Sequence, residues 1–380
     1  MTSILPVTGK RGLDRFARVP ERVRAGEPGW IAPLLVERKD HLGHRNPYFE
    51  HAEAAYFLAT RDGADVGRIS AQLDTLAQPA HGPRVAHFGL LEAADRETLH
   101  GLLAVAAGWA RERGADRIAG PFSLSINDEV GLRVSGFDRP ARMLMNDAPS
   151  WYGPAIEAAG FAGVKDLLAY DLDVARPLPA RAVRMAEQAA GEPRVTERAM
   201  NPKRLHAELR AVIDIFNDAW ADNWGFVPMT EAEVGAMVRN LRPILVPELV
   251  RIAEIDGEPA AMIVALPDLN EALDGVRGRL LPFGWARLLW RLKGRGLSRG
   301  RVLLMGVRRA HRDTALGRAL PALLIHRLHA AARRHGLREV ELSWVLDDNR
   351  PIQRLIDRVG GVESTRSRVY ARDVTPSEGA

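Results

Sequence analysis

A loop rich in arginine and small residues, followed at once by an apolar helix, is the segment best suited to chemistry. It follows the apolar run 302–307 and reads Arg-Arg-Ala-His-Arg-Asp-Thr-Ala-Leu-Gly-Arg-Ala. Unpaired N–H groups at a helix N-terminus and the helix dipole both favour a diphosphate. The alternative is an ordinary α/β crossover without a ligand. The candidate anion-binding residues are Val307, Arg308, Arg309, Arg312, Ala315, Gly317 and Arg318.

A second distinctive segment, residues 275–301, contains eight basic residues and no acid. A helix here would place apolar residues on one face, opposite Arg287 and Arg291. Basic amphipathic segments with tryptophans are typical of a membrane interface, where each basic residue adds ~1 kcal/mol at an anionic surface. An equally supported alternative is a helix packed on its own domain with a solvated basic face. The apolar face would contain Leu281, Trp285, Leu288, Leu289 and Leu292.

Composition excludes several classes of protein. The 380 residues include no cysteine, so disulfides, a thiol nucleophile and cysteine–zinc sites are excluded. No signal peptide and no apolar run of membrane-spanning length are expected. Metalloprotease, hydrolase and Walker motifs are missing, which predicts no metal. The net charge of +5 suits acidic ligands and does not require nucleic acid, and aromatic stacking platforms for bases are not clustered.

The same order of elements occurs twice in the chain. Each half has a hairpin signature, Asp62-Gly63 or Asp256-Gly257, between strand-like runs. Each then has a strand, an amphipathic helix ending at glycine, and a strand ending at an asparagine 13 residues after that glycine. We therefore predict an α/β protein, with a mixed α+β sheet, built from two tandem domains. Their expected bounds are 1–175 and 195–375, with a linker at 176–194.

The order of elements around the arginine-rich loop resembles the acyl-CoA-binding half of the GNAT N-acyltransferase family. The family loop reads Arg/Gln-x-x-Gly-x-Gly/Ala, and Arg312, Ala315 and Gly317 match it, with alanine in place of the first glycine. Alanine allows the same close approach only if its φ is negative. The family's later asparagine corresponds to Asn349, and its acidic tyrosine falls at Ile356. The resemblance implies acyl-CoA as a co-substrate, with no permanently bound cofactor.

Amide formation from a thioester requires an ammonium to lose a proton, a polarised carbonyl and a leaving thiolate. A cluster of polar residues in an apolar context, the polar island at residues 120–129, follows a predicted strand of the first half. The C-terminal ends of strands are where α/β sheets present ligand sites. The island's Asp128 or Glu129 is the candidate base, since burial at a domain junction would raise the pKa. Asn127 is a candidate substrate contact. The alternative is an Asn-Asp turn that caps a helix. Tyr152 and Tyr370 are candidates for the missing acid.

A second polar island, residues 216–228, follows the first helix of the second half. This region contributes to the acceptor pocket in many GNAT proteins, so the resemblance implies that Asn223 and Trp224 bind the acceptor, with Asp222 as another anchor. The alternative is a helix end packed against the neighbouring domain, which suits Trp220 better. Residues 92–97 in the first half include three acids, which would repel a diphosphate. We expect one half to bind CoA and the other to shape the acceptor site.

Across almost its whole length the chain resembles a bacterial tandem-GNAT group that includes the bacterial ceramide synthases. The resemblance implies transfer of a long-chain acyl group from acyl-CoA to the amine of a sphingoid base, by direct attack of the amine on the thioester. The segments that carry it are Pro47-Tyr48-Phe49, Gly67-Arg68-Ile69, 120–131, 223–228 and 304–307.

Three alternatives stay open. An acyl carrier protein could be the donor, since basic loops suit its acidic surface. The chain could instead acetylate a small amine from acetyl-CoA, or bind acyl-CoA or lipid as a non-catalytic sensor. The expected location is the cytoplasm, with peripheral binding to the anionic inner face of the cytoplasmic membrane through 275–301.

Overall fold

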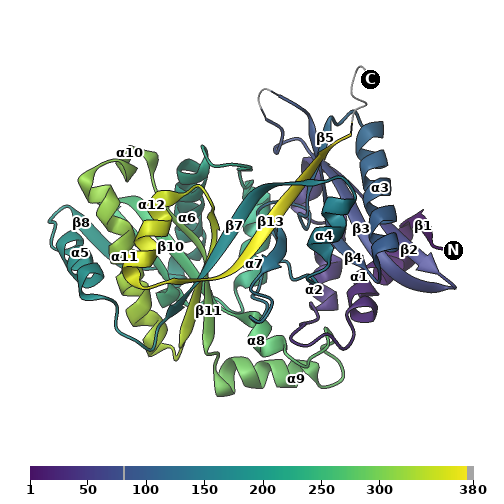
Figure 1. The fold of residues 1–380 in the computed structure, drawn as a ribbon. Coiled ribbons are helices and arrows are strands. Elements are labelled where there is room, and N and C mark those ends of the chain that lie inside the picture. The colour runs from purple at the N-terminus through teal and green to yellow at the C-terminus, as the bar shows by residue number, and fades with distance from the viewer. Residues whose placement is uncertain (80–81, 375–380) are drawn as a thin grey trace. The chain divides into compact units, whose positions relative to one another are not determined.

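The computed structural model describes residues 1–79 and 82–374, apart from the side chains of Lys293 and Arg295. These residues form two compact units (Figure 1). Unit 1 contains residues 1–167, 273–287 and those described from 365 on, and unit 2 contains 168–272 and 288–364. Each unit has a sheet of mixed parallel and antiparallel strands with helices packed against it, as predicted for an α/β protein.

Unit 1 has the strand order β1-β2-β3-β4-β5-β13, in which β4 and β5 are parallel. Helix α3 packs on one face of β3 and β4, and α1 packs on β3 as well. Asp95 caps α3 through the N–H of Thr98. The elements are β1 Ser3–Pro6, α1 Gly9–Val23, α2 Leu35–Leu42, β2 Ala52–Arg61, β3 Ala64–Asp74, β4 Val85–Ala93, α3 Arg96–Glu112, β5 Arg117–Gly120, β6 Leu132–Ser135 and α4 Tyr152–Ala158.

Unit 2 has the strand order β7-β12-β11-β10-β9-β8, in which β11 and β12 are parallel. Its elements are β7 Ala162–Asp173, which begins in unit 1, α5 Ala180–Ala190, β8 Val195–Ala199, α6 Leu205–Trp220, α7 Glu231–Leu241, β9 Val250–Ile255, β10 Glu258–Pro267, α8 Leu269–Leu273, whose last residue belongs to unit 1, α9 Gly284–Leu289, whose residues 284–287 belong to unit 1, β11 Arg299–Val307, α10 Arg309–Arg312, α11 Ala315–Arg334, β12 Glu339–Leu346, α12 Arg350–Val359 and β13 Val362–Asp373, which ends in unit 1.

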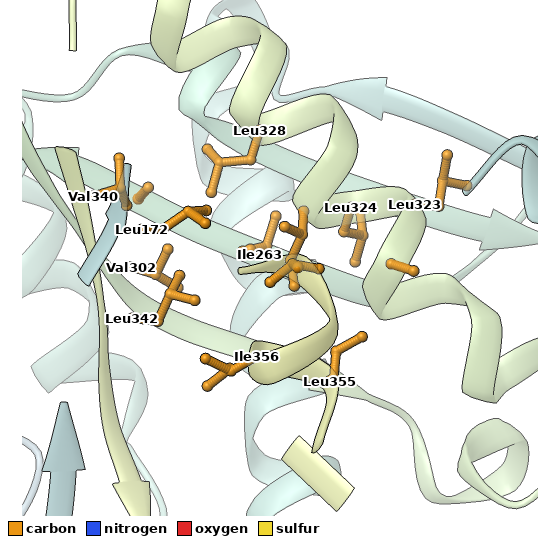
Figure 2. Close-up of a cluster of buried hydrophobic side chains, with 14 of the residues drawn as sticks. Leu172, Ile263, Val302, Leu323, Leu324, Leu328, Val340, Leu342, Leu355 and Ile356 are labelled. Atoms are coloured by element: carbon orange, nitrogen blue, oxygen red, sulfur yellow. The ribbon is translucent and has the colours of Figure 1, made fainter. Parts of the chain in front are cut away.

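The core of unit 2 lies between its strands and helices α11 and α12. Leu324 and Leu328 of α11 point toward Val302 of β11 and Leu342 of β12, and Ile356 of α12 closes the cluster (Figure 2). Burying a side chain of this kind contributes about 1.5–3 kcal/mol. This core holds β11 and the start of α11, the two elements that carry the arginine-rich loop.

Both predicted hairpins are present. Asp62 and Gly63 have φ of 50° and 78°, and Asp256 and Gly257 have φ of 54° and 85°, as a tight two-residue hairpin turn requires. The hairpins connect β2 to β3 and β9 to β10. The internal duplication therefore extends to the turn geometry.

The division into units differs from the expected boundaries at two places. The C-terminal part of β13 lies in unit 1, where Tyr370 to Asp373 pair with Arg117 to Gly120 of β5. Residues 273–287 also lie in unit 1, where Gly278 accepts a hydrogen bond from Leu35. In addition, the expected linker contains α5, whose Ala182, Ala186 and Ala189 are buried. The expected domain bounds themselves stay a prediction.

The segment 281–295 is not the single helix we expected. Helix α9 spans only Gly284–Leu289, and a π-helical turn follows from Trp290 to Arg295. The two arginines that we placed on the basic face both bond backbone carbonyls: the exposed Arg287 donates to that of Gly275, and the half-buried Arg291 donates to that of Ala272 at 3.0 Å. Five large apolar side chains of this segment are exposed: Leu281 78%, Phe283 79%, Trp285 52%, Leu289 45% and Trp290 59%. Leu288 and Leu292 are half-buried.

Candidate functional site

The arginine-rich loop of unit 2 ends at the N-terminus of α11 as predicted. Thr314 caps the helix by accepting a hydrogen bond from the N–H of Gly317 at 3.0 Å. The N–H groups of Ala315 and Leu316 have no partner among the described residues. A Cβ on Gly317 would lie 1.9 Å from the carbonyl oxygen of His311, so only glycine fits. Ala315 is the first helical residue and has negative φ, which satisfies the condition for replacing the family's first glycine.

The arginines of this loop are occupied by neighbouring groups. The backbone N–H of Arg309 donates to Asp218 at 2.7 Å and its guanidinium donates to the same carboxylate at 3.2 Å. Arg312 pairs with Asp222 at 3.2 Å. Burial alone would raise the pKa of Asp218, but the hydrogen bonds from Arg309 hold it below its usual value. Arg308 and Arg318 donate to backbone carbonyls, Pro259 and Asp313 respectively.

Strand β11 offers an open backbone edge beside the loop. Its parallel pairing with β12 runs from Arg299–Glu339 to Val302–Leu342, and the described residues show no further pair although both strands continue. The register against β10 shifts between Val264 and Ala265, so Leu303 is the extra residue of a β-bulge. Residues 303–307 are half-buried. Strand amides left unpaired in this way can pair with an extended ligand.

Asn349 has a structural role in the ligand-free protein. Its side chain caps α12 by accepting from the N–H of Ile352 at 3.4 Å. Ile356, at the position of the family tyrosine, is 1% exposed in the core of unit 2 (Figure 2). A proton donor is therefore missing from this position.

The second polar island lies beside the loop of unit 2. A Cβ on Gly306 of β11 would meet the Trp220 ring at 2.4 Å, so Trp220 packs closely on this strand. Trp224 and Asn223 are half-buried, and the N–H of Asn223 donates to the carbonyl of Trp220. Asp222, expected to anchor the acceptor, pairs with Arg312 instead. The acceptor roles of Asn223 and Trp224 stay predictions.

The polar island of unit 1 is a loop that connects β5 to β6, so the helix-capping alternative is wrong. Asp128 accepts from the N–H of Ser125 at 3.3 Å, and the N–H of Asn127 donates to the Ser125 hydroxyl. Glu129 pairs with the buried Arg38 at 2.7 Å. Burial raises the pKa of Glu129, but the Arg38 charge and hydrogen bond outweigh it and lower the pKa to about 2. The expected raised pKa at Glu129 is therefore wrong.

The two tyrosines proposed as acids are both buried in unit 1. The Tyr152 hydroxyl accepts from the N–H of Ala93 at 2.6 Å and donates to the Ala93 carbonyl at 3.0 Å. Burial and the charge of Glu92 raise the Tyr152 pKa well above its usual value. Burial and the charge of Glu157 raise the pKa of Tyr370 to about 12. Both therefore stay protonated at neutral pH, and no finding tests their role as acids.

Sequence reasoning missed a buried charged group in unit 1. Arg68 of β3 is directly opposite Glu92 of β4, and both are buried. A signal was present, because polar residues occupy every second position of β3 at Arg68, Ser70, Gln72 and Asp74. Among the described residues, no cluster of histidine and acidic side chains could hold a metal ion.

Comparison with known proteins places this geometry in context. No family model matches the chain. The chain is 43% identical to a protein named bacterial ceramide synthase from Caulobacter vibrioides, over 97% of both chains. It is 38% identical to protein YghO of Escherichia coli, over 96% of this chain and 94% of that protein.

Solved structures share the fold at low sequence identity. A tandem GNAT protein from the clavulanic acid biosynthesis pathway matches with a TM-score of 0.59 and 14% identity over all of both chains. A GCN5-related N-acetyltransferase from Sphaerobacter thermophilus matches with a TM-score of 0.52 and 16% identity, over 99% of this chain and 98% of that chain. These matches confirm the predicted tandem GNAT fold.

Proposed function

Because the chain belongs to the family of tandem GNAT-fold N-acyltransferases that includes the bacterial ceramide synthase, we propose that it transfers a long-chain acyl group from acyl-CoA to the amine of a sphingoid base. The observation that carries the donor half of this proposal is the arginine-rich end of α11. There, the free N–H groups of Ala315 and Leu316 lie beside three arginines and the open edge of β11.

The donor would bind to unit 2 through its diphosphate and its extended arm. The helix N-terminus and Arg309, Arg312 and Arg318 supply positive charge for the diphosphate. The pantetheine arm carries amides that can pair with the edge of residues 303–307 that faces away from β10, where no pair with β12 is formed. Arg309 and Arg312 would then exchange their carboxylate partners for phosphate oxygens.

The reaction follows from the chemistry of a thioester and an amine. The neutral amine attacks the thioester carbonyl, the C–N bond forms, the C–S bond breaks, and CoA leaves as a thiolate that takes up a proton. Asn127, Asn223 and Trp224 are the proposed acceptor contacts, Tyr152 is the proposed acid, and Asp128 and Glu129 are the candidate bases. The low pKa of Glu129, about 2, makes it a weak base.

Segment 281–290 supports a lipid acceptor and peripheral binding to an anionic membrane. Five large apolar side chains are exposed there, two of them tryptophans, and the surrounding residues 275–301 contain no acid. Tryptophan and arginine are the residues that interfacial segments use at anionic lipid. No helix among the described residues combines the length and apolarity needed to cross a bilayer.

CoA release, followed with a thiol reagent, tests the proposal, and the chain itself adds no thiol background. Palmitoyl-CoA and acetyl-CoA are compared, each with and without sphinganine. Release from palmitoyl-CoA that depends on sphinganine is expected. The variant Arg309→Ala/Arg312→Ala should lose donor binding, whereas Arg334→Ala, at the far end of the same helix, should not.

Other outcomes would replace the proposal. Release from acetyl-CoA alone would indicate a small-amine acetyltransferase. Release only from an acylated carrier protein would change the donor, and palmitoyl-CoA binding without release under any condition would indicate a sensor.

A further inference from the structure

Strand β3 of unit 1 carries polar residues on one face, although Leu58 of β2, opposite Arg68, belongs to an apolar cluster with Phe16 of α1. Arg68, Ser70, Gln72 and Asp74 alternate along β3 and are each at most 4% exposed. The residues between them, Ile69, Ala71 and Leu73, belong to the apolar core that includes α3. Burying polar groups costs free energy unless partners satisfy them. A row of four therefore requires a reason.

Several polar side-chain atoms on this face of β3 have no hydrogen-bond partner among the described residues. Arg68 donates through Nη1 to the carbonyl of Phe16 at 3.1 Å. Its Nε, the hydroxyl of Ser70 and the side-chain oxygen of Gln72 are buried without a hydrogen-bond partner among the described residues. Glu92, directly across the ladder from Arg68, has only the Tyr152 hydroxyl at 3.5 Å. Neither Arg68 nor Glu92 has an ion-pair partner within 4.0 Å in the described part of the chain.

The charged groups around Glu92 come from several elements. Arg68 on β3 and Arg24 after α1 carry positive charge toward it, and Arg24 is itself paired with Glu27 and Asp147. The hydroxyl of Tyr152 in α4 lies 3.5 Å from the Glu92 carboxylate. Burial raises the pKa of Glu92 to about 7, although Arg24 and Arg68 act in the opposite direction. Glu92 is thus partly ionised at neutral pH, as a base requires.

The duplicated unit shows that the fold does not need these charges. Gly67 pairs with Ala93 in unit 1 and Ala261 pairs with Val307 in unit 2. By this register, Arg68 and Glu92 correspond to Met262 and Gly306. The bulge in β4 directly precedes Glu92, whereas the bulge in β11, at Leu303, lies three residues before Gly306. The ionisable pair is therefore a property of unit 1 alone, whereas unit 2 carries the phosphate loop.

We infer that the Arg68–Glu92 face of unit 1, including Ser70 and Gln72, is a binding site for the polar head of an amino alcohol, in which Glu92 takes the proton from the ammonium. Glu92 and the Gln72 oxygen accept hydrogen bonds from nitrogen, while Arg68 and Ser70 bind hydroxyl groups. The step converts an ammonium and a carboxylate into a neutral amine and a carboxylic acid. The neutral amine is the form whose lone pair can attack a thioester, and Glu92 later releases its proton to solvent. This inference rests on the proposed function, for which it names the acceptor site.

The test compares Glu92→Gln with Glu97→Gln, which removes an exposed acid at the start of α3. Sphinganine-dependent CoA release from palmitoyl-CoA is measured from pH 6 to 8.5 with the full chain. The wild-type rate should rise through pH 7, and Glu97→Gln should keep that rise. Glu92→Gln should lose it and fall by about 100-fold or more at pH 8, with unchanged palmitoyl-CoA affinity. A Glu92→Gln profile that still rises through pH 7 would overturn the inference.

A measurement of sphinganine binding distinguishes failure of this inference from failure of the proposed function. Sphinganine binding in mild detergent is measured without donor by the change in intrinsic fluorescence. Wild-type binding that Glu92→Gln weakens about tenfold or more, with no turnover by any variant, would keep the site and reject the transfer reaction. Equal turnover by the wild type and Glu92→Gln would support the transfer reaction and reject the site. Wild-type protein that binds no sphinganine would also reject the site. Thermal unfolding at pH 6, where Glu92 is mostly protonated, checks that the variant is folded.

Discussion

Two carboxylates at the end of α6 have opposite consequences for a diphosphate in the loop. Asp218 holds the backbone N–H of Arg309 and so shapes the loop itself. Asp222 is about half exposed and reaches Arg312 at 3.2 Å and Arg309 at 3.7 Å. Asp222 therefore pairs with the same guanidinium groups that a phosphate would bind. One residue therefore supports donor binding and the other competes with it.

We expect Asp222→Asn to bind CoA more tightly and Asp218→Asn to bind it more weakly. Exposed ion pairs are worth about 0.2–1 kcal/mol, so the gain at Asp222 should be at most about fivefold. Titration calorimetry with CoA at low and moderate salt measures both. Asp214→Asn, an exposed acid on the same helix, is the control and should match wild type. Weaker binding by Asp222→Asn would show that this carboxylate does not compete with the ligand.

Glu92 and Glu129 are the same residue type in opposite environments. The raised pKa of Glu92, about 7 against a usual 4.5, means that the folded state prefers its protonated form. The associated stability is present below pH 4.5 and is lost as pH rises through 7. For Glu129, with a pKa of about 2, the stability is present above pH 4.5 and is lost as pH falls through 2.

Glu92→Gln should therefore stabilise the protein relative to wild type at pH 8, by at most about 3 kcal/mol, and much less at pH 5. Glu129→Gln should destabilise it at both pH values, because Arg38 would be buried without its partner. Urea unfolding at the two pH values measures these changes. A pH-independent effect of Glu92→Gln would contradict the raised pKa.

At the scale of elements, the junction between the loop and α11 depends on close backbone packing. Gly317 leaves no room for a Cβ beside His311, whereas Ala315 sits at the first turn with ordinary helical φ. The family pattern is thus required at one glycine position and relaxed at the other.

Gly317→Ala should lower stability by about 1–3 kcal/mol through overpacking and should weaken CoA binding. Ala315→Gly restores the family residue and should change CoA affinity by less than about twofold, at a stability cost of about 1 kcal/mol or less. Thermal unfolding and CoA titration measure the pair. If Ala315→Gly and Gly317→Ala lost equal affinity for CoA, the close contact at Gly317 would not be the cause. The loop would then be sensitive to any substitution.

The exposed apolar side chains of segment 281–290 predict that it binds an anionic membrane surface. Trp285→Ala/Trp290→Ala should weaken binding to anionic vesicles by about tenfold, if each half-exposed tryptophan contributes about 0.7–1 kcal/mol at the interface. Flotation with phosphatidylglycerol-containing vesicles measures it. Val362→Ala, which also removes exposed apolar surface, should have no effect. Wild-type protein that stays with the soluble fraction would reject the membrane contact.

At the scale of the whole molecule, the last strand of the chain completes the first unit. Residues from 370 pair with β5, and Tyr370 is 1% exposed in the unit 1 core. Unit 1 is therefore incomplete until the residues of β13 from 365 to 373 have been made. A domain cut at residue 175 would lack this strand.

A chain that ends at residue 364 should lose the native structure of unit 1, because β5 loses one of its two partner strands and the core loses Tyr370. Hydrogen exchange should show lost protection in β3 and β4 and retained protection in β10 and β11. A chain that ends at residue 374 is the control and should match the full chain. Full protection of β3 and β4 in the shorter chain would show that unit 1 folds without the strand.

Sequence alone determined the features that depend on neighbours along the chain. The two Asp-Gly hairpins and the glycine at position 317 follow from backbone conformation within a few residues. The GNAT fold and the family were predicted from the order of such elements. These features depend on residues that are close together in the sequence, so they can be predicted without the tertiary structure.

Only the tertiary structure decided which charges meet. Glu129 pairs with Arg38, 91 residues away, which reversed its expected pKa shift. Asp218 is 91 residues from Arg309, and Glu92 lies across the ladder from Arg68. A carboxylate's pKa depends on its burial and on charges within a few ångströms. Both quantities come into being only when distant segments fold together, which is why the sequence indicated the loop but not the state of its acids.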